Sequence, residues 1–350
     1  MILKKIEELE GNEILARAVV TFDYQIILPE GAVLKPEYVS TLEELGIIEV
    51  YIKQEDLKTE EIVILRSEVE ESVKVKVKEI ISRHTYQGNK NLEELSKTAD
   101  SIITNILEEE QVIEKIYDIK QRSSDIYEHS ISICSLSILT ALKMKVKKEN
   151  VHDIGVACLL HDLGLRYITA SYENKEVEEY EENDKKEYKK HPIYGYSALQ
   201  DEMWISDLCK DIILSHHERI DGTGYPLKKK KLSLECRIVN VCDQFDELIC
   251  GIGCKRMKVY EAIEYLKQYT GSRFDDKVVS TFLAFTAVYP AGSRVLTNEG
   301  ETAVVIRQNK NFLERPVLRI LKDKDGNTLE KEVIKDMVKI RTIFIEKGID

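Results

Sequence analysis

The chain has 350 residues, of which 43% are hydrophobic and 33% charged, a mixture typical of a folded globular protein and too apolar for a disordered one. This length allows two or three domains, because single domains usually have about 100 to 200 residues. The formal net charge of -12 argues against duplex nucleic acid and anionic membranes as partners, since both recruit basic surfaces.

The first residues, MILKKIEELEGNEIL, contain no apolar signal region, and no stretch approaches the roughly 20 apolar residues of a membrane span. We therefore expect a cytoplasmic protein without membrane contact. The seven cysteines favour reduced thiols over a disulfide framework, because their number is odd and no export signal is present. Cys250 and Cys254 form a C-x3-C pair without the partners of a zinc knuckle, so we interpret both as core or helix residues.

The predicted elements begin with a small α+β domain over residues 1–62. Short β-rich runs (EILARAVV, YQIIL, IIEVYI) alternate there with turn signals and one short helical stretch, PEYVSTLEEL. Residues 63–120 are charged and helical in pattern, as in SEVEESVKVKVKEIISRH and LEELSKTADSIITNILEEE. This second segment predicts helices that connect two domains.

Residues 121–288 have the apolar spacing of a helical domain. In HSISICSLSILTALKMKV, apolar residues recur at steps of three and four, which predicts one buried helix face. The charged stretch at 174–190 predicts a solvated loop or helix end. Residues 289–350 contain the short strand-like runs SRVLT, ETAVVIRQ and PVLRILKD, which predict a small C-terminal β domain. The predicted fold class is therefore mainly α, with a helical bundle between two small domains.

All candidates for a chemical site lie in the helical segment. Neutral imidazole is the commonest protein ligand for borderline metals, and carboxylates join it where two or more metals must be bridged. His161 and Asp162 end the apolar helical run VACLLHDLG, which would deliver both side chains to the interior. His152 and Asp153 form a similar pair, but they follow the polar KKEN and are predicted at the surface.

A second group of histidines lies further along. His216, His217 and Glu218 end the apolar run DIILSHHE and lead into DGTGYP, whose two glycines allow a tight loop beside a site. His191 begins a predicted helix in HPIYGYSAL. These positions alone do not distinguish a metal site from ordinary helix ends.

Two further pairs complete the candidates. Asp243 and Asp246 lie one helical turn apart in RIVNVCDQFDEL, and Asp125 and His129 have the i, i+4 spacing that places two side chains on one helix face. Each pair by itself is typical of a surface helix. The set as a whole, however, has an order that single pairs lack.

That order, HD, HP-x-x-G, HHE-x-x-DG-x-GYP and then D-x-x-D, resembles the HD-GYP subgroup of the HD phosphohydrolase superfamily. The resemblance covers about residues 121–288, and the long HHE motif is far more specific than the HD pair. Members are helical-bundle phosphodiesterases that open cyclic di-GMP to linear pGpG, and some continue to GMP. The resemblance thus implies an HD-type helical bundle with this activity and a cyclic dinucleotide as its partner.

The resemblance also implies a cofactor and residue roles. Two or three divalent transition metals, commonly iron or manganese, would activate a bridging hydroxide that attacks phosphorus. Asp162 would bridge two metals, while Asp125 stands where three-metal members usually have a glutamate. Catalytic roles are implied for His161, Asp162 and Asp246, and substrate contacts for Tyr225 and Lys255. The implied metal ligands are Asp125, His129, His161, Asp162, His191, His216, His217 and Asp243.

Two departures from the subgroup's pattern leave alternatives open. Leu165 stands where members often have a lysine that contacts phosphate, and Ile252 stands where an arginine is usual. Loss of such a cation predicts slow turnover, which Lys228 to Lys231 are not expected to rescue. The alternatives are a non-catalytic or weakly active module that senses a cyclic dinucleotide, or a phosphodiesterase for another cyclic dinucleotide. A homodimer or a signalling partner protein also stays open.

Overall fold

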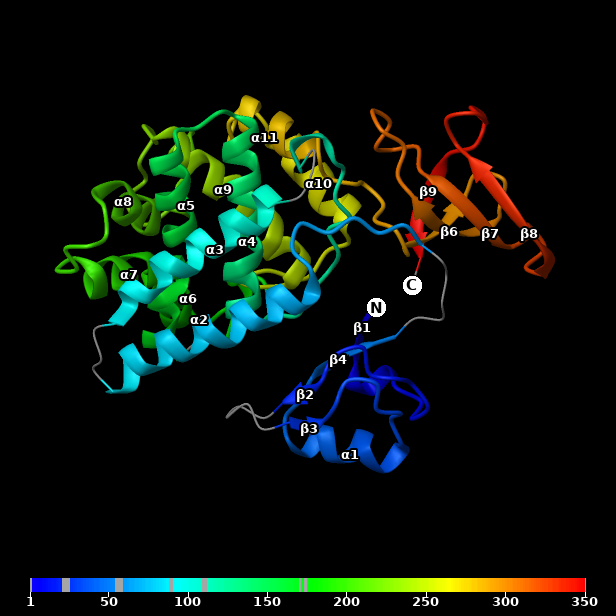
Figure 1. Cartoon of the computed structure of the whole chain (residues 1–350), viewed down its shortest axis with the longest axis horizontal. Coiled ribbons are helices and arrows are strands. Elements are labelled where there is room, and N and C mark those ends of the chain that lie inside the picture. The colour runs from blue at the N-terminus through cyan, green and yellow to red at the C-terminus, as the bar shows by residue number, and fades with distance from the viewer. Residues whose placement is uncertain are drawn as a thin grey trace. The chain divides into compact units, whose positions relative to one another are not determined.

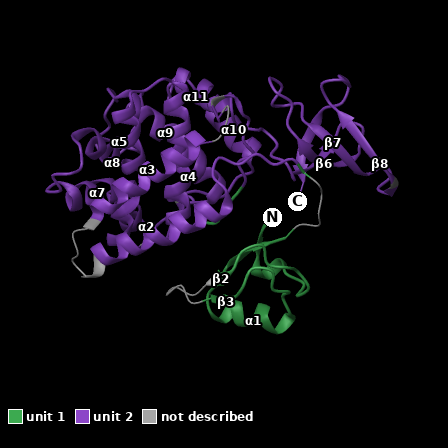
Figure 2. Cartoon of the chain, viewed as in Figure 1, with its two compact units in different colours: residues 1–59, 121–123 green, residues 60–120, 124–350 purple. Residues whose placement is uncertain are grey.

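The computed structural model describes residues 2–20, 26–53, 59–87, 91–108, 112–169, 171–172 and 175–349. It divides the chain into two compact units (Figure 2): residues 1–59 with 121–123, and residues 60–120 with 124–350. The predicted division into four segments is finer than this and stays a prediction. Within the described residues, no helix combines the length and the apolar character needed to cross a membrane.

The first unit is α+β, as its sequence predicts. Strand β1 (Ile2–Lys5) pairs antiparallel with β4 (Glu49–Ile52), and β2 (Val19–Val20) pairs with β3 (Ile26–Leu28). Helix α1 (Pro36–Glu44) begins with a proline, whose missing N–H costs nothing in the first turn. Leu15, Leu34 and Leu42 are fully buried in the small core between these elements.

The second unit is mostly helical (Figure 1), which confirms the predicted fold class. Helix α4 is buried along almost its whole length, from Tyr127 to Ala141, and packs against α2, α3, α5, α9 and α11. The apolar spacing of this segment predicted only one buried face; the helix is instead the centre of the bundle. The helices are α2 (Ser67–Gln87), α3 (Glu94–Glu108), α4 (Ile126–Lys143), α5 (Lys148–Leu160), α6 (Glu182–Tyr188), α7 (His191–Leu199), α8 (Asp207–Ser215), α9 (Leu234–Cys250), α10 (Val259–Gln268) and α11 (Asp276–Leu283).

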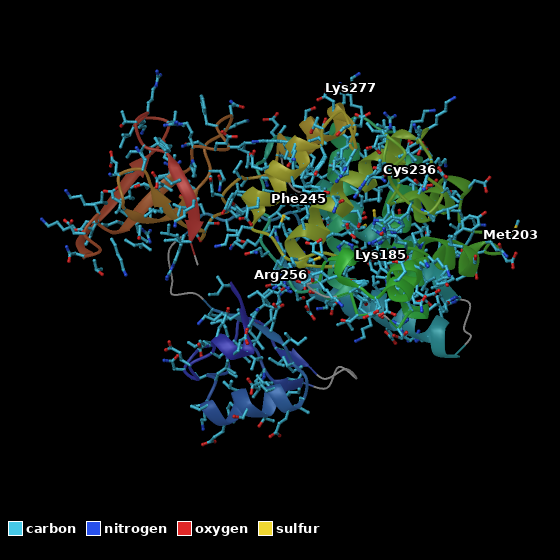
Figure 3. All side chains as sticks on the ribbon, turned by 180° about the vertical axis from the view of Figure 1, so that it is seen from behind. Lys185, Met203, Cys236, Phe245, Arg256 and Lys277 are labelled. Carbon is cyan, nitrogen blue, oxygen red and sulfur yellow. The ribbon has the colours of Figure 1, made fainter. Side chains whose placement is uncertain are left out.

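Helix ends determine which residues reach the middle of this bundle. Ser206 and Ser233 accept a backbone hydrogen bond at the starts of α8 and α9, and Gly251 closes α9 in the left-handed conformation that suits glycine. Helix α5 ends at Leu160 and passes directly into the 3-10 helix η4 (His161–Tyr167). Phe245 of α9 lies in the bundle (Figure 3), with its ring 4.9 Å from that of Phe282.

The charged stretch 174–190 differs from its prediction as a solvated segment. It contains helix α6, and two of its tyrosines, Tyr180 and Tyr188, are buried. They form a small cluster with Leu165, and the rings of the two tyrosines meet edge to face. The burial of these two tyrosines could not be predicted from the sequence, because charged residues flank each of them.

The chain ends in a five-stranded antiparallel sheet with strand order β8-β7-β6-β5-β9, which confirms the predicted C-terminal β region. Three of its strands match the runs identified in the sequence; β8 and β9 were not anticipated. The strands are β5 (Arg294–Thr297), β6 (Thr302–Arg307), β7 (Val317–Lys322), β8 (Thr328–Asp336) and β9 (Ile345–Ile349).

One buried carboxylate, that of Asp118, links three separate segments of the second unit. It accepts hydrogen bonds from the backbone N–H of Ile62 at 2.9 Å, the N–H of Ala291 at 2.7 Å and the side-chain amide of Gln308 at 2.8 Å. Burial raises the pKa of Asp118, although these hydrogen bonds oppose the shift. The same side chain therefore contacts the segment before α2, the segment before β5 and the segment after β6.

Candidate metal centre

Five histidines and two aspartates converge in the middle of the helical bundle. They come from elements far apart in the sequence: α4, η4, the first residue of α7, the residues that follow α8, and α9. All seven are buried or nearly so. These residues are His129, His161, Asp162, His191, His216, His217 and Asp243.

Backbone carbonyls fix the protonation of three of these histidines. In each, ring atom Nδ1 lies within hydrogen-bonding distance of the carbonyl oxygen three residues earlier, so the proton belongs on Nδ1. The lone pair of Nε2 then faces the interior of the site. These bonds join His161 to Cys158, His191 to Tyr188 and His216 to Ile213, at 2.8, 2.7 and 2.7 Å.

The Nε2 atoms face one another at short distances. His191 lies 3.0 Å from His216 and 3.2 Å from His217, and His129 lies 3.3 Å from His161. Lone pairs that face each other in this way repel, and a cation between them removes the repulsion. In addition, Asp243 Oδ1 is buried and accepts no hydrogen bond. The donor set therefore fits a divalent metal.

The donors form two groups that share one carboxylate. Asp162, His191, His216 and His217 form the first group, and His129, His161 and Asp243 form the second. Asp162 Oδ1 lies 3.3 Å from His191 Nε2, while Oδ2 lies 3.1 Å from His161 Nε2. Since its two oxygens face different groups, Asp162 has the geometry of a bridging ligand.

Electrostatics favour the protonation states that metals require at His216, His217 and Asp162. Burial lowers the pKa of His216 and His217 well below the usual range, and neighbouring histidines lower it further. Burial works to raise the pKa of Asp162, but the nearby histidines hold it well below its usual value. His129 differs: burial opposes its protonation, but the neighbouring carboxylates of Asp243 and Asp246 raise its pKa well above the usual range, so a metal bound there would displace a proton.

Sequence reasoning missed Asn240, which holds one edge of the site. Its side-chain amide nitrogen lies within hydrogen-bonding distance of the carbonyl oxygens of His216 and Glu218, at 2.8 and 2.5 Å, and more distantly of that of Ser215, at 3.2 Å. The Glu218 carboxylate in turn accepts from the backbone N–H groups of Leu227 and Lys229, which closes the DGTGYP loop. Only the spacing of Asn240 three residues before Asp243 could have indicated its position.

Gly164 allows η4 and α7 to meet. A side-chain carbon at this position would overlap the carbonyl oxygen of His191, so only glycine permits the observed approach. Gly195, on the facing part of α7, has more room, because a carbon there would be 3.4 Å from its nearest neighbour. The approach at Gly164 brings Asp162 next to His191.

The remaining predicted site residues have varied positions. Asp246 contacts His129 Nδ1 at 2.8 Å and accepts from Ser132, so it touches a predicted ligand from its outer side. The ring of Tyr225 stacks on that of His217, with centroids 4.6 Å apart. Lys255 is exposed, and its ammonium group pairs with Glu179.

Asp125 lies apart from the converging donors of the described residues. It precedes the first turn of α4, where its carboxylate accepts from the N–H groups of Tyr127 and Glu128. Its other oxygen is 3.4 Å from the ammonium group of Lys74. His84 and His152 also lie outside the converging set; both are half-buried, whereas His152 was predicted at the surface.

Both departures from the expected cations are buried apolar residues. Leu165 packs with Tyr180 and Tyr188, and Ile252 is 1% exposed just after α9. Among the four lysines after the DGTGYP loop, Lys229 pairs with Asp211 at 2.5 Å. No cation therefore stands at either of the two positions where the resemblance implied one.

Two family models match parts of the second unit. The family model described as "HD domain" matches residues 77–278, and that described as "KOW domain associated with HD domain" matches residues 294–350. The cyclic di-GMP phosphodiesterase PA4108 of Pseudomonas aeruginosa is 30% identical over 228 residues, which are 64% of this chain and 55% of that protein. A cyclic di-GMP phosphodiesterase of Thermotoga maritima is 30% identical over 202 residues, 54% of this chain and 53% of that one.

The chain spans about half the length of these two relatives. Among solved structures, Bd1817, an HDG"Y"P protein from Bdellovibrio bacteriovorus, aligns with a TM-score of 0.55 and 20% identity. The alignment covers 80% of this chain and 97% of that protein. This similarity concerns the fold alone.

Proposed function

Because the chain belongs to the HD domain family, we propose that it is a metal-dependent phosphodiesterase that hydrolyses cyclic di-GMP to pGpG, with GMP as a further product. The observation that carries the proposal is the buried pair of ligand groups that share Asp162. The names of its relatives support the substrate, and the donor chemistry supports the reaction.

The converging histidines and aspartates would hold two divalent metals, and a third if a further carboxylate takes part. Imidazole and carboxylate donors suit iron or manganese, which we propose as the metals. When bound, such metals neutralise phosphoryl oxygens and lower the pKa of water toward neutrality. Asp125 was a predicted ligand for the third metal, and its position at the start of α4 gives that role no support.

The chain's own residues prepare the site for this chemistry. The carbonyl oxygens of Cys158, Tyr188 and Ile213 hold a proton on Nδ1 of the adjacent histidines, which leaves Nε2 free to bind. Asp246 does the same for His129 through Nδ1. The bundle buries these groups away from water. Because the surroundings are less polar than water, each electrostatic interaction among these groups is stronger.

The test is incubation of anaerobically purified protein, loaded with Mn²⁺ or Fe²⁺, with cyclic di-GMP, followed by separation of the products. We expect pGpG to accumulate, and a His161→Ala variant to lose the activity because one predicted ligand is gone. Equal product from both proteins, or none from either, would contradict the proposal. Parallel incubation with other cyclic dinucleotides tests whether guanine is required.

A second candidate function is a metal-bound sensor that binds a cyclic dinucleotide with little turnover. It is favoured by the apolar, buried positions of Leu165 and Ile252 and by the pairing of Lys255 with Glu179. Binding of cyclic di-GMP without product would support it. The substitution Leu165→Lys would be a poor test for rescue of phosphodiesterase activity, because the new ammonium group would be buried in an apolar cluster.

A further inference from the structure

Glu247 is a buried carboxylate that none of the roles described so far uses. It lies on α9 four residues after Asp243, a spacing that places both side chains on one face of the helix. Only 8% of the residue is exposed. The helix face that carries Asp243 into the metal centre therefore carries Glu247 there too.

The donor atoms of Glu247 lie among those of predicted ligands. One ligand atom each of His217, Asp243 and Glu247 all lie within 4.8 Å of one another. Glu247 Oε1 is 3.9 Å from His217 Nε2, and Asp243 Oδ2 is 3.6 Å from His217 Nδ1. One imidazole and two carboxylates form a donor set that suits Mn²⁺ or Fe²⁺.

The protein itself leaves this group of donors incompletely satisfied. Gln244, which is neutral, donates to Glu247 Oε2 at 3.1 Å. Across the residues that the structure describes, no lysine or arginine pairs with the Glu247 carboxylate. Asp243, which is 1% exposed, keeps Oδ1 without a hydrogen bond. Buried carboxylates are costly unless they are paired or coordinate a metal, so this arrangement calls for a cation.

We propose that Glu247 is a metal ligand that lies beside His217 and Asp243 and adds a further carboxylate to the metal centre. This inference rests on the proposed function only in that the bundle interior is a metal centre. It replaces Asp125 as the source of the additional carboxylate. Asp125 already satisfies two backbone N–H groups at the start of α4 and faces Lys74.

The experiment counts bound Mn²⁺ directly. Metal-free full-length protein is titrated with Mn²⁺, and free Mn²⁺ is measured by electron paramagnetic resonance, for the wild type, Glu247→Gln, Glu247→Ala and Asp125→Asn. We expect both Glu247 variants to lose one Mn²⁺ equivalent or to bind it at least about tenfold more weakly, since even partners behind a ligand contribute that much. Asp125→Asn serves as the matched control, because asparagine caps a helix about as well as aspartate.

The outcomes separate this inference from the proposed function. Wild-type stoichiometry and affinities in both Glu247 variants would overturn the role of Glu247 and leave the other ligands intact. Loss of a metal in Asp125→Asn, with none lost in the Glu247 variants, would assign the carboxylate to Asp125 instead. A wild type that binds no Mn²⁺ would overturn both proposals. If Glu247→Ala fails to fold by circular dichroism, Glu247→Gln, which has the same size, carries the test.

Discussion

At the scale of single residues, the candidate site depends on side chains that contact the predicted ligands from outside. Asp246 lies behind His129 and accepts from its Nδ1, and Asn240 donates to the carbonyl oxygen of His216. Partners of this kind orient a ligand and set which ring nitrogen carries the proton. Their removal should therefore affect metal binding without removing a ligand.

Asp246→Asn tests this directly. The amide can donate to His129 Nδ1 and so move the proton to Nε2, which would then no longer bind a metal. We expect Mn²⁺ affinity at the His129 group to fall by about 10- to 100-fold, measured by the same titration. Ser132→Ala, which removes a different contact of Asp246, is the control and should have a smaller effect. Equal affinity in Asp246→Asn and wild type would contradict the assigned proton position.

Glu13 provides a pH test of the stability of the first unit. Burial opposes ionisation of Glu13, but backbone N–H groups of residues 10–12 lower its pKa from 4.5 to about 2. A carboxylate whose folded pKa is lowered stabilises the fold above its unfolded pKa, and this contribution is lost as pH falls from 4.5 toward about 2.

Glu13→Gln should accordingly lower the stability of the first unit at neutral pH and have little effect near pH 2, where the wild-type carboxylate is protonated as well. The measurement is amide hydrogen exchange at Leu15 and Leu34, compared between variant and wild type at each pH. Glu43→Gln, at an exposed position in α1, is the control. A difference that persists unchanged at about pH 2 would contradict the assigned cause.

The residues that converge could be named from the sequence, whereas the residues that support them could not. The HD, HP-x-x-G, HHE and D-x-x-D motifs contain ligand-type side chains in a fixed order, and the resemblance added His129. Asp125 was placed with them by its i, i+4 spacing from His129, but the helix begins one residue later and the carboxylate caps it. Asn240 and Glu247 have no motif of their own, because their contacts arise only when α8 and α9 pack together.

At the scale of elements, short helix ends bring the site together. Helix α5 changes to η4 at His161, α7 begins at His191, and α8 ends just before His216. Apolar periodicity predicted these helices, yet it could not predict that η4 and α7 approach closely. That approach depends on the missing side chain of Gly164, which the sequence shows only as one glycine among 16.

Gly164→Ala should therefore disturb the metal centre more than Gly195→Ala does. The new carbon would push the start of α7 from η4, and we expect a loss of about 1–3 kcal/mol in the free energy of unfolding together with weaker Mn²⁺ binding. Gly195→Ala, on the facing helix, has ordinary packing distances and should change stability by less than about 1 kcal/mol. Denaturant unfolding measures the free energy of unfolding of both variants. Similar decreases in Gly164→Ala and Gly195→Ala would contradict this account.

At the scale of the whole molecule, metal binding should stabilise one unit and not the other. All converging ligands lie in the second unit, and so does Trp204, the only tryptophan of the chain. A metal present at about 100 times its dissociation constant contributes about 2.7 kcal/mol to the folded state. The fluorescence of Trp204 thus reports on the unit that contains the metal centre.

Chelation should lower the urea midpoint followed by Trp204, while hydrogen exchange at Leu15 of the first unit stays unchanged. His161→Ala should respond less to the chelator, because its affinity for metal is already reduced. Loss of protection at Leu15 on chelation would show that the first unit depends on the metal centre. Apolar spacing and the resemblance predicted the mainly helical fold, but only the packed structure assigns residues 60–120 to the same unit as the site.

The three hydrogen bonds of Asp118 limit where this protein can be divided into fragments. A polypeptide cut at residue 290 would lose the N–H of Ala291 and the amide of Gln308, and would keep only the bond from Ile62. The carboxylate would then be left in a partly dismantled pocket. The C-terminal sheet is for this reason a poor unit for deletion or exchange with another protein, and a graft is best designed with Asp118 and its three donors kept together.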